Sequence, residues 1–155
     1  MKLRIHSVAG KMPSWVETGV SEYTRRLPRE LQPEWRIQAL AKRGKNVKSL
    51  DVMAQETDRL LSALKPQDHA VLLDVDGNAW DTPALARHLA DWQQGGSDVA
   101  LIIGGPDGVD DRLRARARQR WSLSPLTLPH PVVRIVVAEQ LYRAWTILQG
   151  HPYRK

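Results

Sequence analysis

Residues 99–108 read VALIIGGPDG, five apolar residues followed at once by a glycine-rich turn. An uninterrupted apolar run of this length is typical of a strand that is covered on both faces of a parallel sheet. Residues 70–77, AVLLDVDG, repeat the arrangement with a second apolar strand and a second turn. Because ligands of open α/β proteins bind at the carboxyl ends of the strands, both turns are candidate ligand-binding loops.

The segments on either side alternate between strand and helix patterns. Strands are predicted at residues 3–7 and 34–40, and helices at 16–27, 50–64, 82–95 and 131–149. Thr82 is the expected N-cap of the third helix, ahead of Pro83. The expected buried face of the second helix consists of Leu50, Met53, Ala54, Thr57, Leu60, Leu61 and Leu64. This alternation predicts an α/β fold with a mostly parallel sheet.

Two segments before the last helix are harder to assign. Residues 110–120 place arginine at every second position from Arg112 onward, but Ala, Arg and Gln favour helix, so a helix is predicted. Residues 121–131, WSLSPLTLPHP, are too proline-rich for a central strand. Two interpretations stand. One is an extended loop that binds a base edge through its backbone, with Leu123, Leu126 and Leu128 as an apolar wall. The other is a strand followed by a proline-initiated helix.

The composition limits the class of protein. A length of 155 residues predicts a single domain over residues 1–155. The chain has no cysteine, which excludes disulfides and thiolate sites, and we expect no metal. The sequence shows neither a signal peptide nor a membrane-spanning apolar run, so a cytoplasmic protein without a membrane partner is expected. Lys and Arg number 23 against 17 Asp and Glu, and the net charge of +6 favours a polyanion such as RNA.

The last helix has an unusual distribution of charge. Glu139, Arg143 and Thr146 fall on one stripe, whereas Arg134 falls nearly opposite, inside a ring of apolar residues. A buried arginine of this kind is expected to need an anionic or carbonyl partner. Because the helix is apolar around most of its circumference, we expect it to contact the sheet and a further surface, which a second subunit would supply.

Five motifs carry a resemblance to a known family. They are LDVDG at 73–77, IIGGPDG at 102–108, LSPLTLPH at 123–130, AEQLYRA at 138–144 and HPY at 151–153. In this order, and with the basic loop KRGKN at 42–46, the whole chain resembles the RlmH family. The resemblance implies a SPOUT-type parallel sheet flanked by helices, with a C-terminal trefoil knot, in a homodimer. Residue patterns cannot predict the knot, because knots are nearly absent among folds.

The same resemblance implies a cofactor and a substrate. The family binds S-adenosylmethionine in the knot, which assigns the cofactor to Leu73, Gly104, Leu123, Ser124, Pro125, Leu126, Thr127 and Leu128. The implied substrate is a pseudouridine in the intersubunit stem-loop of 23S rRNA, methylated at N3 on the assembled ribosome. Leu126 stands where methionine is common in the family, a mild change of volume in an apolar wall.

Three residues are candidates for catalysis on this reading. Transfer of a methyl group to N3 requires that nitrogen to lose its proton, so a base or a cationic stabiliser would help. His130 is a candidate proton acceptor, Arg143 a stabiliser of developing negative charge, and Tyr153 a residue that orients or stacks the base. The family often has a histidine after the tyrosine, whereas this chain has Arg154, so a histidine base at that position is not available.

Other functions are compatible with the same sequence. A SPOUT methyltransferase that acts on tRNA or on another rRNA site would share the fold and the cofactor. An RNA- or ribosome-binding module without catalysis would use the same basic loop and arginine-rich segment. Bound S-adenosylmethionine would separate this module from the methyltransferases. A flavodoxin-like nucleotide binder is disfavoured, because neither G-x-G-x-x-G after the first strand nor G-x-x-x-x-G-K-[ST] is present.

Overall fold

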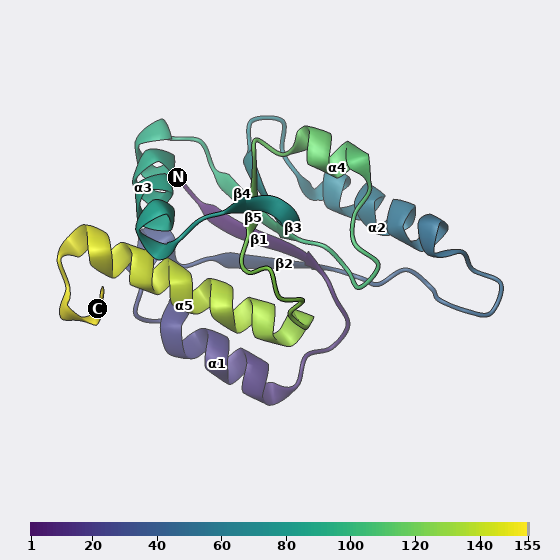
Figure 1. The fold of residues 1–155 in the computed structure, drawn as a ribbon, viewed down its shortest axis with the longest axis horizontal. Coiled ribbons are helices and arrows are strands. Elements are labelled where there is room, and N and C mark those ends of the chain that lie inside the picture. The colour runs from purple at the N-terminus through teal and green to yellow at the C-terminus, as the bar shows by residue number, and fades with distance from the viewer. Residues whose placement is uncertain (155) are drawn as a thin grey trace.

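A five-stranded parallel sheet forms the centre of the protein, whose computed structural model describes residues 1–154 (Figure 1). The strand order is β2-β1-β4-β3-β5, and every neighbouring pair is parallel. The strands are β1 (Leu3–Val8), β2 (Glu34–Gln38), β3 (His69–Ala79), β4 (Val99–Ile103) and β5 (Gln119–Ser122). The predicted α/β fold with a parallel sheet is therefore confirmed.

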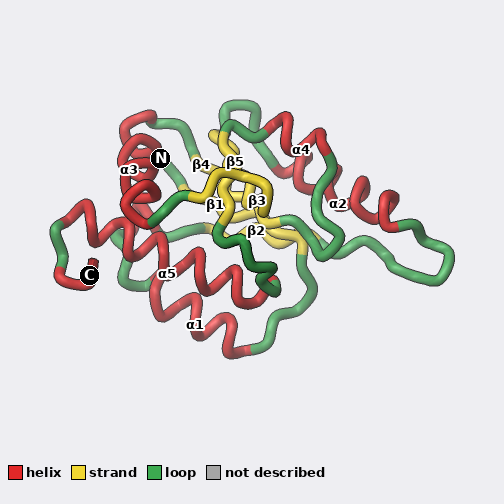
Figure 2. The backbone as a smooth tube through the Cα atoms, viewed as in Figure 1, coloured by secondary structure: helices red, strands yellow, loops and turns green. Residues whose placement is uncertain are grey.

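Helices cover both faces of this sheet (Figure 2). One face carries α1 (Ser14–Thr24), α3 (Thr82–Gly95) and α5 (His130–Gln149), with α5 packed against both of the others. The opposite face carries α2 (Ser49–Ala63) and α4 (Asp111–Arg116). Two short 3-10 helices, η1 (Arg29–Leu31) and η2 (Pro152–Arg154), complete the fold. The two faces have separate apolar cores, as alternating strand residues require.

The strand predicted from the opening stretch has the predicted bounds, and all five residues of β4 are buried. It lies between β1 and β3, the central position that a continuous apolar run indicates. Strand β3 differs from the prediction because it does not stop at Asp74. It continues to Ala79 through an irregularity in its pairing with β5 between Leu73 and Asn78. The predicted turn at 74–77 is therefore an irregular part of a longer strand.

Gly77 explains why the strand can deform at this point. A Cβ atom at Gly77 would lie 2.7 Å from the backbone carbon of Arg120 and 2.8 Å from its oxygen. Backbone cannot yield to such a contact as a flexible side chain can, so only glycine lets β3 and β5 approach this closely. The close approach brings Asp74 next to the arginines that follow β4.

The helix predicted over 110–120 is wrong beyond Arg116. Helix α4 ends there, and residues 119–122 form β5, which pairs with β3 at the edge of the sheet. The alternating arginines were the correct signal for this strand. Pairing with β3, which starts at the bond from Arg118 N to the Ala70 oxygen (2.8 Å), outweighs the helix propensity of the segment.

Two predicted helix starts also move by one residue. Asp81, not Thr82, is the N-cap of α3, because its carboxylate accepts a hydrogen bond from Ala84 N at 2.8 Å. Helix α5 begins at His130, with Pro131 in its first turn. Residues 123–129 form a loop between β5 and this helix, as the first of the two interpretations expects. Of the second interpretation, only the strand residues 121–122 and the helix after Pro129 are present.

Within residues 1–154, no helix combines the length and apolar character needed to cross a bilayer. Within the same range, no three His, Asp or Glu side chains gather in a way that would hold a metal ion.

Candidate functional site

Three segments that are far apart in the sequence meet in one pocket of about 310 Å³. They are the irregular part of β3 at residues 73–76 and the loops that follow β4 and β5, so the pocket lies toward the carboxyl ends of the strands, where ligands bind in open α/β folds. Of the eight residues expected to bind a cofactor, all except Pro125 line the pocket. The lining members are Leu73, Gly104, Leu123, Ser124, Leu126, Thr127 and Leu128.

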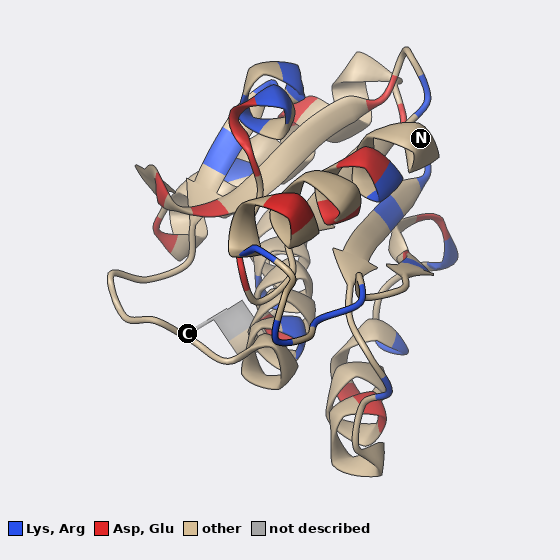
Figure 3. Cartoon of the chain, turned by 90° about the vertical axis from the view of Figure 1, so that its right-hand side faces the viewer, with Lys and Arg blue, Asp and Glu red and all other residues tan. Residues whose placement is uncertain are grey.

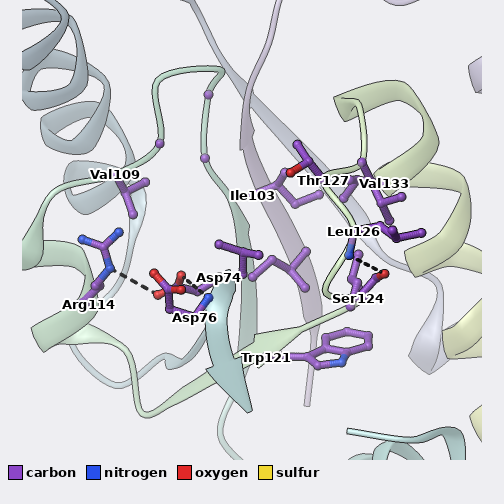
Figure 4. A pocket seen from close by; sticks show the side chains of 17 residues that line it. Asp74, Asp76, Ile103, Val109, Arg114, Trp121, Ser124, Leu126, Thr127 and Val133 are labelled. Carbon is purple, nitrogen blue, oxygen red and sulfur yellow. Dashed lines mark hydrogen bonds and ion pairs between the residues drawn. The ribbon is translucent and has the colours of Figure 1, made fainter. Parts of the chain in front are cut away.

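The walls of the pocket differ in chemistry (Figure 4). Asp74, Asp76 and Arg114 lie on one side, and Leu126, Thr127 and Val133 on the other, with Ile103 between them. The Asp74 side chain is only 5% exposed, and it accepts from Arg114 Nε at 3.2 Å and from Arg120 Nη1 at 3.3 Å. A carboxylate this deeply buried requires such partners. The pocket thus combines one charged wall with one apolar wall.

A buried donor lies among the lining residues. Trp121 is 2% exposed and lines the pocket, and its indole Nε1 has no hydrogen-bond partner within residues 1–154. Buried N–H groups are almost always paired, so an unpaired one beside a pocket favours a ligand that carries an acceptor. At the rim, Val75 and Leu126 are 61% and 70% exposed, which leaves apolar surface open around the mouth.

The loop after β4 is a tight turn that forms one side of the pocket. Gly108 N donates to the Gly105 oxygen at 2.9 Å, and Gly108 has a φ of +82°, which favours glycine. Gly104 has no positive φ, and its lack of a side chain serves packing instead. A Cβ there would lie 2.8 Å from Val109 Cγ1. Of the three glycines in this loop, only Gly108 has a positive φ.

The loop of residues 123–129 is held by its own serines. Ser124 Oγ accepts from Leu126 N at 2.9 Å, and Ser122 Oγ donates to the Ser124 oxygen at 3.3 Å. Such local bonds hold the backbone in a turn without regular secondary structure. The loop thereby presents its backbone groups and apolar side chains to the pocket in a fixed arrangement.

His130 starts α5 beside this loop, in contact with a buried arginine. Arg134 Nε donates to His130 Nε2 at 3.0 Å, and Arg134 Nη2 donates to Ser7 Oγ at 3.1 Å. Burial, together with the neighbouring Arg134 cation, lowers the pKa of His130 to about 4. The proton of the neutral ring therefore resides on Nδ1, because Nε2 is the acceptor.

The expectation for the partners of Arg134 is not met. Its contacts are the His130 ring, the Ser7 hydroxyl and the face of Trp35, whose centroid lies 5.3 Å from the guanidinium carbon. None of these is a carboxylate or a carbonyl group. Burial lowers the pKa of Arg134, and the more distant charge of Glu17 opposes that shift. The cation is stabilised by a ring face and by neutral acceptors.

The other two catalytic candidates form a cluster at the opposite end of α5. Glu139 accepts from Arg143 Nη2 at 2.8 Å and from the Tyr153 hydroxyl at 2.7 Å. The Arg143 guanidinium also lies over the Tyr153 ring, 4.8 Å from its centroid. Burial and then the hydrogen bond to Glu139 raise the pKa of Tyr153 to about 12, and the Glu139 hydrogen bond raises the pKa of Arg143. Both groups keep their protons at neutral pH.

The structure does not bring the three catalytic candidates together. His130 and Arg143 are separated by thirteen residues of one helix, which corresponds to about 20 Å at 1.5 Å per residue. Arg143 and Tyr153 do not line the pocket, whereas Val133 does. Figure 1 shows α5 running from the loops at the strand ends toward the C-terminus. The pocket and the Glu139–Arg143–Tyr153 cluster are thus separate features of one chain.

Two pocket residues, Asp74 and Trp121, were not singled out from the sequence. Asp74 had a usable signal, because it ends an otherwise apolar strand, where a charge must find a partner. Trp121 had none, since its role depends on the position of β5, of which residues 119–120 were predicted as helix and residues 121–122 had two interpretations.

The family described as "Predicted SPOUT methyltransferase" matches residues 1–154. Proteins named "Ribosomal RNA large subunit methyltransferase H" are 50% identical in Hahella chejuensis, 52% in Chromohalobacter salexigens and 48% in Saccharophagus degradans. Each alignment covers all of this chain and 99–100% of the relative. The chain therefore belongs to the RlmH family of SPOUT methyltransferases.

Proposed function

We propose that this protein transfers a methyl group from S-adenosylmethionine to N3 of a pseudouridine in 23S rRNA, in the intersubunit stem-loop of the large subunit, on the assembled ribosome. The observation that carries the proposal is the convergence of the irregular part of β3 and the loops after β4 and β5 on one pocket. The relatives named for methylation of large-subunit RNA match the chain from end to end, which supports the same class of substrate.

The residues of the pocket fit the proposed cofactor. The apolar wall around Ile103 and Val133 suits an adenine ring, and the unpaired Trp121 Nε1 offers a donor for an acceptor atom. The exposed carboxylate of Asp76 suits the positive charge of a sulfonium or an ammonium group, whereas Asp74 is already paired with Arg114 and Arg120. When bound, S-adenosylmethionine supplies an electrophilic methyl group on a positively charged sulfur. The chain contributes the shape and charge that hold it.

The protonation states around α5 favour an electrostatic role over a general base. His130 has a pKa of about 4 and its Nε2 already accepts from Arg134, so it is a weak proton acceptor at neutral pH. Tyr153 stays protonated, with a pKa of about 12. Arg143 is the group suited to the reaction, because a cation beside the imide lowers the pKa of N3 and stabilises the anion that attacks. In this proposal His130 donates through Nδ1 and Tyr153 orients the base.

The separation of the two features suggests that two subunits complete one site. Arg143 lies about 20 Å along α5 from His130, so it cannot reach a base held at the pocket of its own chain. We infer a homodimer in which Arg143 and Tyr153 of one copy reach the pocket of the other. The half-buried Val132 and Val136 on α5, and Trp15 of α1, which is 54% exposed, provide apolar surface for the pairing.

Family membership also supports the proposed trefoil knot in the C-terminal part of the chain. The knot would be formed where residues 104–108 and 123–129 meet, because both loops line the same pocket. A knotted chain refolds slowly, since threading must precede the final packing.

Mass spectrometry of 23S rRNA tests the proposed function. Ribosomes from a deletion strain should lack one methyl group on a pseudouridine, and the purified protein with S-adenosylmethionine should restore it on intact ribosomes. Parallel reactions with isolated large subunits, free 23S rRNA and tRNA identify the substrate. Methylation of tRNA or of another rRNA position would replace the proposed substrate. Failure of the protein to bind S-adenosylmethionine would instead favour an RNA-binding module without catalysis.

A further inference from the structure

The basic loop, residues 42–48, contains four cationic side chains, of which one forms ion pairs and three are exposed. Lys42, Lys45 and Lys48 are exposed, and no acidic side chain within residues 1–154 forms an ion pair with them. Arg43 instead forms ion pairs with Glu56 of α2 and with Asp107 of the loop after β4. Figure 3, with this side toward the viewer, shows basic positions along the loop and acidic positions on the neighbouring helix α2.

The buried carboxylate of Glu56 holds Ala41 and Arg43 in place. The Glu56 side chain is fully buried, and its two oxygens accept from Ala41 N at 2.9 Å, from Arg43 Nη1 at 3.0 Å and from Arg43 Nη2 at 3.2 Å. A carboxylate with no exposure is stable only while such partners remain. The two-pronged contact from Arg43 matches the geometry of a carboxylate, which a lysine cannot reproduce.

Arg43 extends the contact from Glu56 to the wall of the pocket. Its Nε and Nη2 atoms donate to Asp107 Oδ2 at 3.2 Å and 3.0 Å. Asp107 belongs to the turn between Gly105 and Gly108, and both of these glycines line the pocket. One guanidinium therefore joins the basic loop, helix α2 and the turn of residues 105–108.

Helix α2 holds the same turn at two further points. A Cβ at Gly105 would lie 2.5 Å from Glu56 Oε1, so the backbone of the turn rests directly on this carboxylate. Asp110 N donates to Oγ1 of the buried Thr57 at 3.2 Å. The turn is thus held by contacts at Gly105, Asp107 and Asp110, and two of these contacts depend on Glu56 or on its partner Arg43.

We propose that Arg43 is a positioning residue that fixes the turn of residues 105–108 for cofactor binding, while the three lysines of the same loop are left to contact RNA phosphates. This inference rests on the proposed function for the identity of the cofactor. The seven residues of the basic loop would then have two roles, which are positioning of the turn by Arg43 and RNA binding by the lysines. Loss of Arg43 affects the pocket, whereas loss of an exposed lysine affects only affinity for the polyanion.

Amide hydrogen exchange in the protein without ligand tests the positioning itself. Arg43→Ala should speed exchange at Gly108 N–H and Asp110 N–H by at least about tenfold, with β4 unchanged. Lys45→Ala, from the same loop, is the matched control and should leave both amides unchanged. Asp107→Ala removes the acceptor of Arg43 Nε and Nη2 and leaves the contact with Glu56, so it provides a second test if Arg43→Ala does not fold. Equal exchange in wild type, Arg43→Ala and Asp107→Ala would overturn the proposal.

Calorimetry with S-adenosylmethionine and binding to 23S rRNA then separate the roles of the residues. Arg43→Ala should weaken cofactor binding by about tenfold, with partial recovery in Arg43→Lys, and Lys45→Ala should weaken only RNA binding. Wild-type cofactor affinity in Arg43→Ala, combined with lost RNA affinity, would make Arg43 an RNA contact and contradict the inference. Absence of cofactor binding in the wild-type protein would contradict the proposed function, while the exchange data would still decide the role of Arg43.

Discussion

The two ends of helix α5 differ in whether one chain alone forms a pocket there. At its first turn, Val133 lines a pocket together with the irregular part of β3 and the loops after β4 and β5, all from the same chain. Near its last turns, Glu139 and Arg143 form a charged cluster with Tyr153, and neither Arg143 nor Tyr153 lines that pocket. The first end has the shape of a ligand site, and the second has charged groups without a cavity. This difference is the basis of the proposal that one chain holds the cofactor and that a second copy supplies the charged groups for the reaction.

The largest effect is expected from the charged end. Arg143→Ala should reduce methyl transfer by about 100-fold or more, because it removes the cation that stabilises the N3 anion. Cofactor binding, measured by calorimetry, should stay within about twofold of wild type, since Arg143 does not line the pocket. A variant that loses cofactor binding and activity in parallel would show that the two ends are not separate.

A smaller effect is expected at the pocket end. Gly104→Val should weaken cofactor binding by at least about tenfold, because its Cβ would meet Val109 Cγ1 at 2.8 Å and displace the loop. Val109→Ala in the same chain makes room, so the double variant should regain part of the affinity. If the double variant binds the cofactor no better than Gly104→Val, the ligand itself needs the space at Gly104. That result would contradict the explanation based on the contact with Val109.

The smallest effect concerns the protonation of His130. Its folded pKa of about 4 lies below the ordinary value of 6.5, so the unfolded chain binds the extra proton first as the pH falls. The contribution of His130 to the free energy of unfolding is therefore fully present above pH 6.5. It declines toward pH 4 by on the order of 1–3 kcal/mol.

Denaturant unfolding of wild type and His130→Gln between pH 4 and 8 measures this decline. His6 has a lowered pKa from burial and contributes with the same sign, so the difference between the two proteins is the relevant quantity. An NMR titration midpoint for His130 above pH 6 would contradict the lowered pKa and would make His130 a candidate proton acceptor again.

Local patterns predicted most of the fold. The run at 99–103 gave β4 with its observed bounds, since a strand covered on both faces needs no information beyond its own apolar residues. The first two residues of β5 were assigned to a helix and the last two had two interpretations, because the residues QRWS gain their conformation from pairing with β3. The buried face of α2 was only partly right. Leu50 is 69% exposed, whereas Glu56 is fully buried, since its partners lie on a loop outside the helix.

The site was predictable at the level of loops and less so at the level of residues. The carboxyl ends of β3 and β4 were recognised from strand order and glycines alone, and the family motifs added the loop after β5. Asp74 and Trp121 depend on the irregular pairing of β3 with β5, which no local pattern encodes. The predicted helix over 131–149 already implied the distance between His130 and Arg143, whereas only the structure shows which end of α5 faces the pocket.

Mixing two impaired variants tests most directly the claim that each site is divided between subunits. Gly104→Val weakens cofactor binding and Arg143→Ala removes the cation, so at a cofactor concentration below the wild-type Kd each variant alone should keep about a tenth of wild-type activity or less. Refolded together in equal amounts, with heterodimers verified by native mass spectrometry, they should recover roughly a quarter of wild-type activity. This follows because half of the dimers are mixed and each mixed dimer has one intact site. Verified heterodimers whose methyl transfer does not exceed that of either variant alone would contradict the divided site and would place Arg143 with the pocket of its own chain.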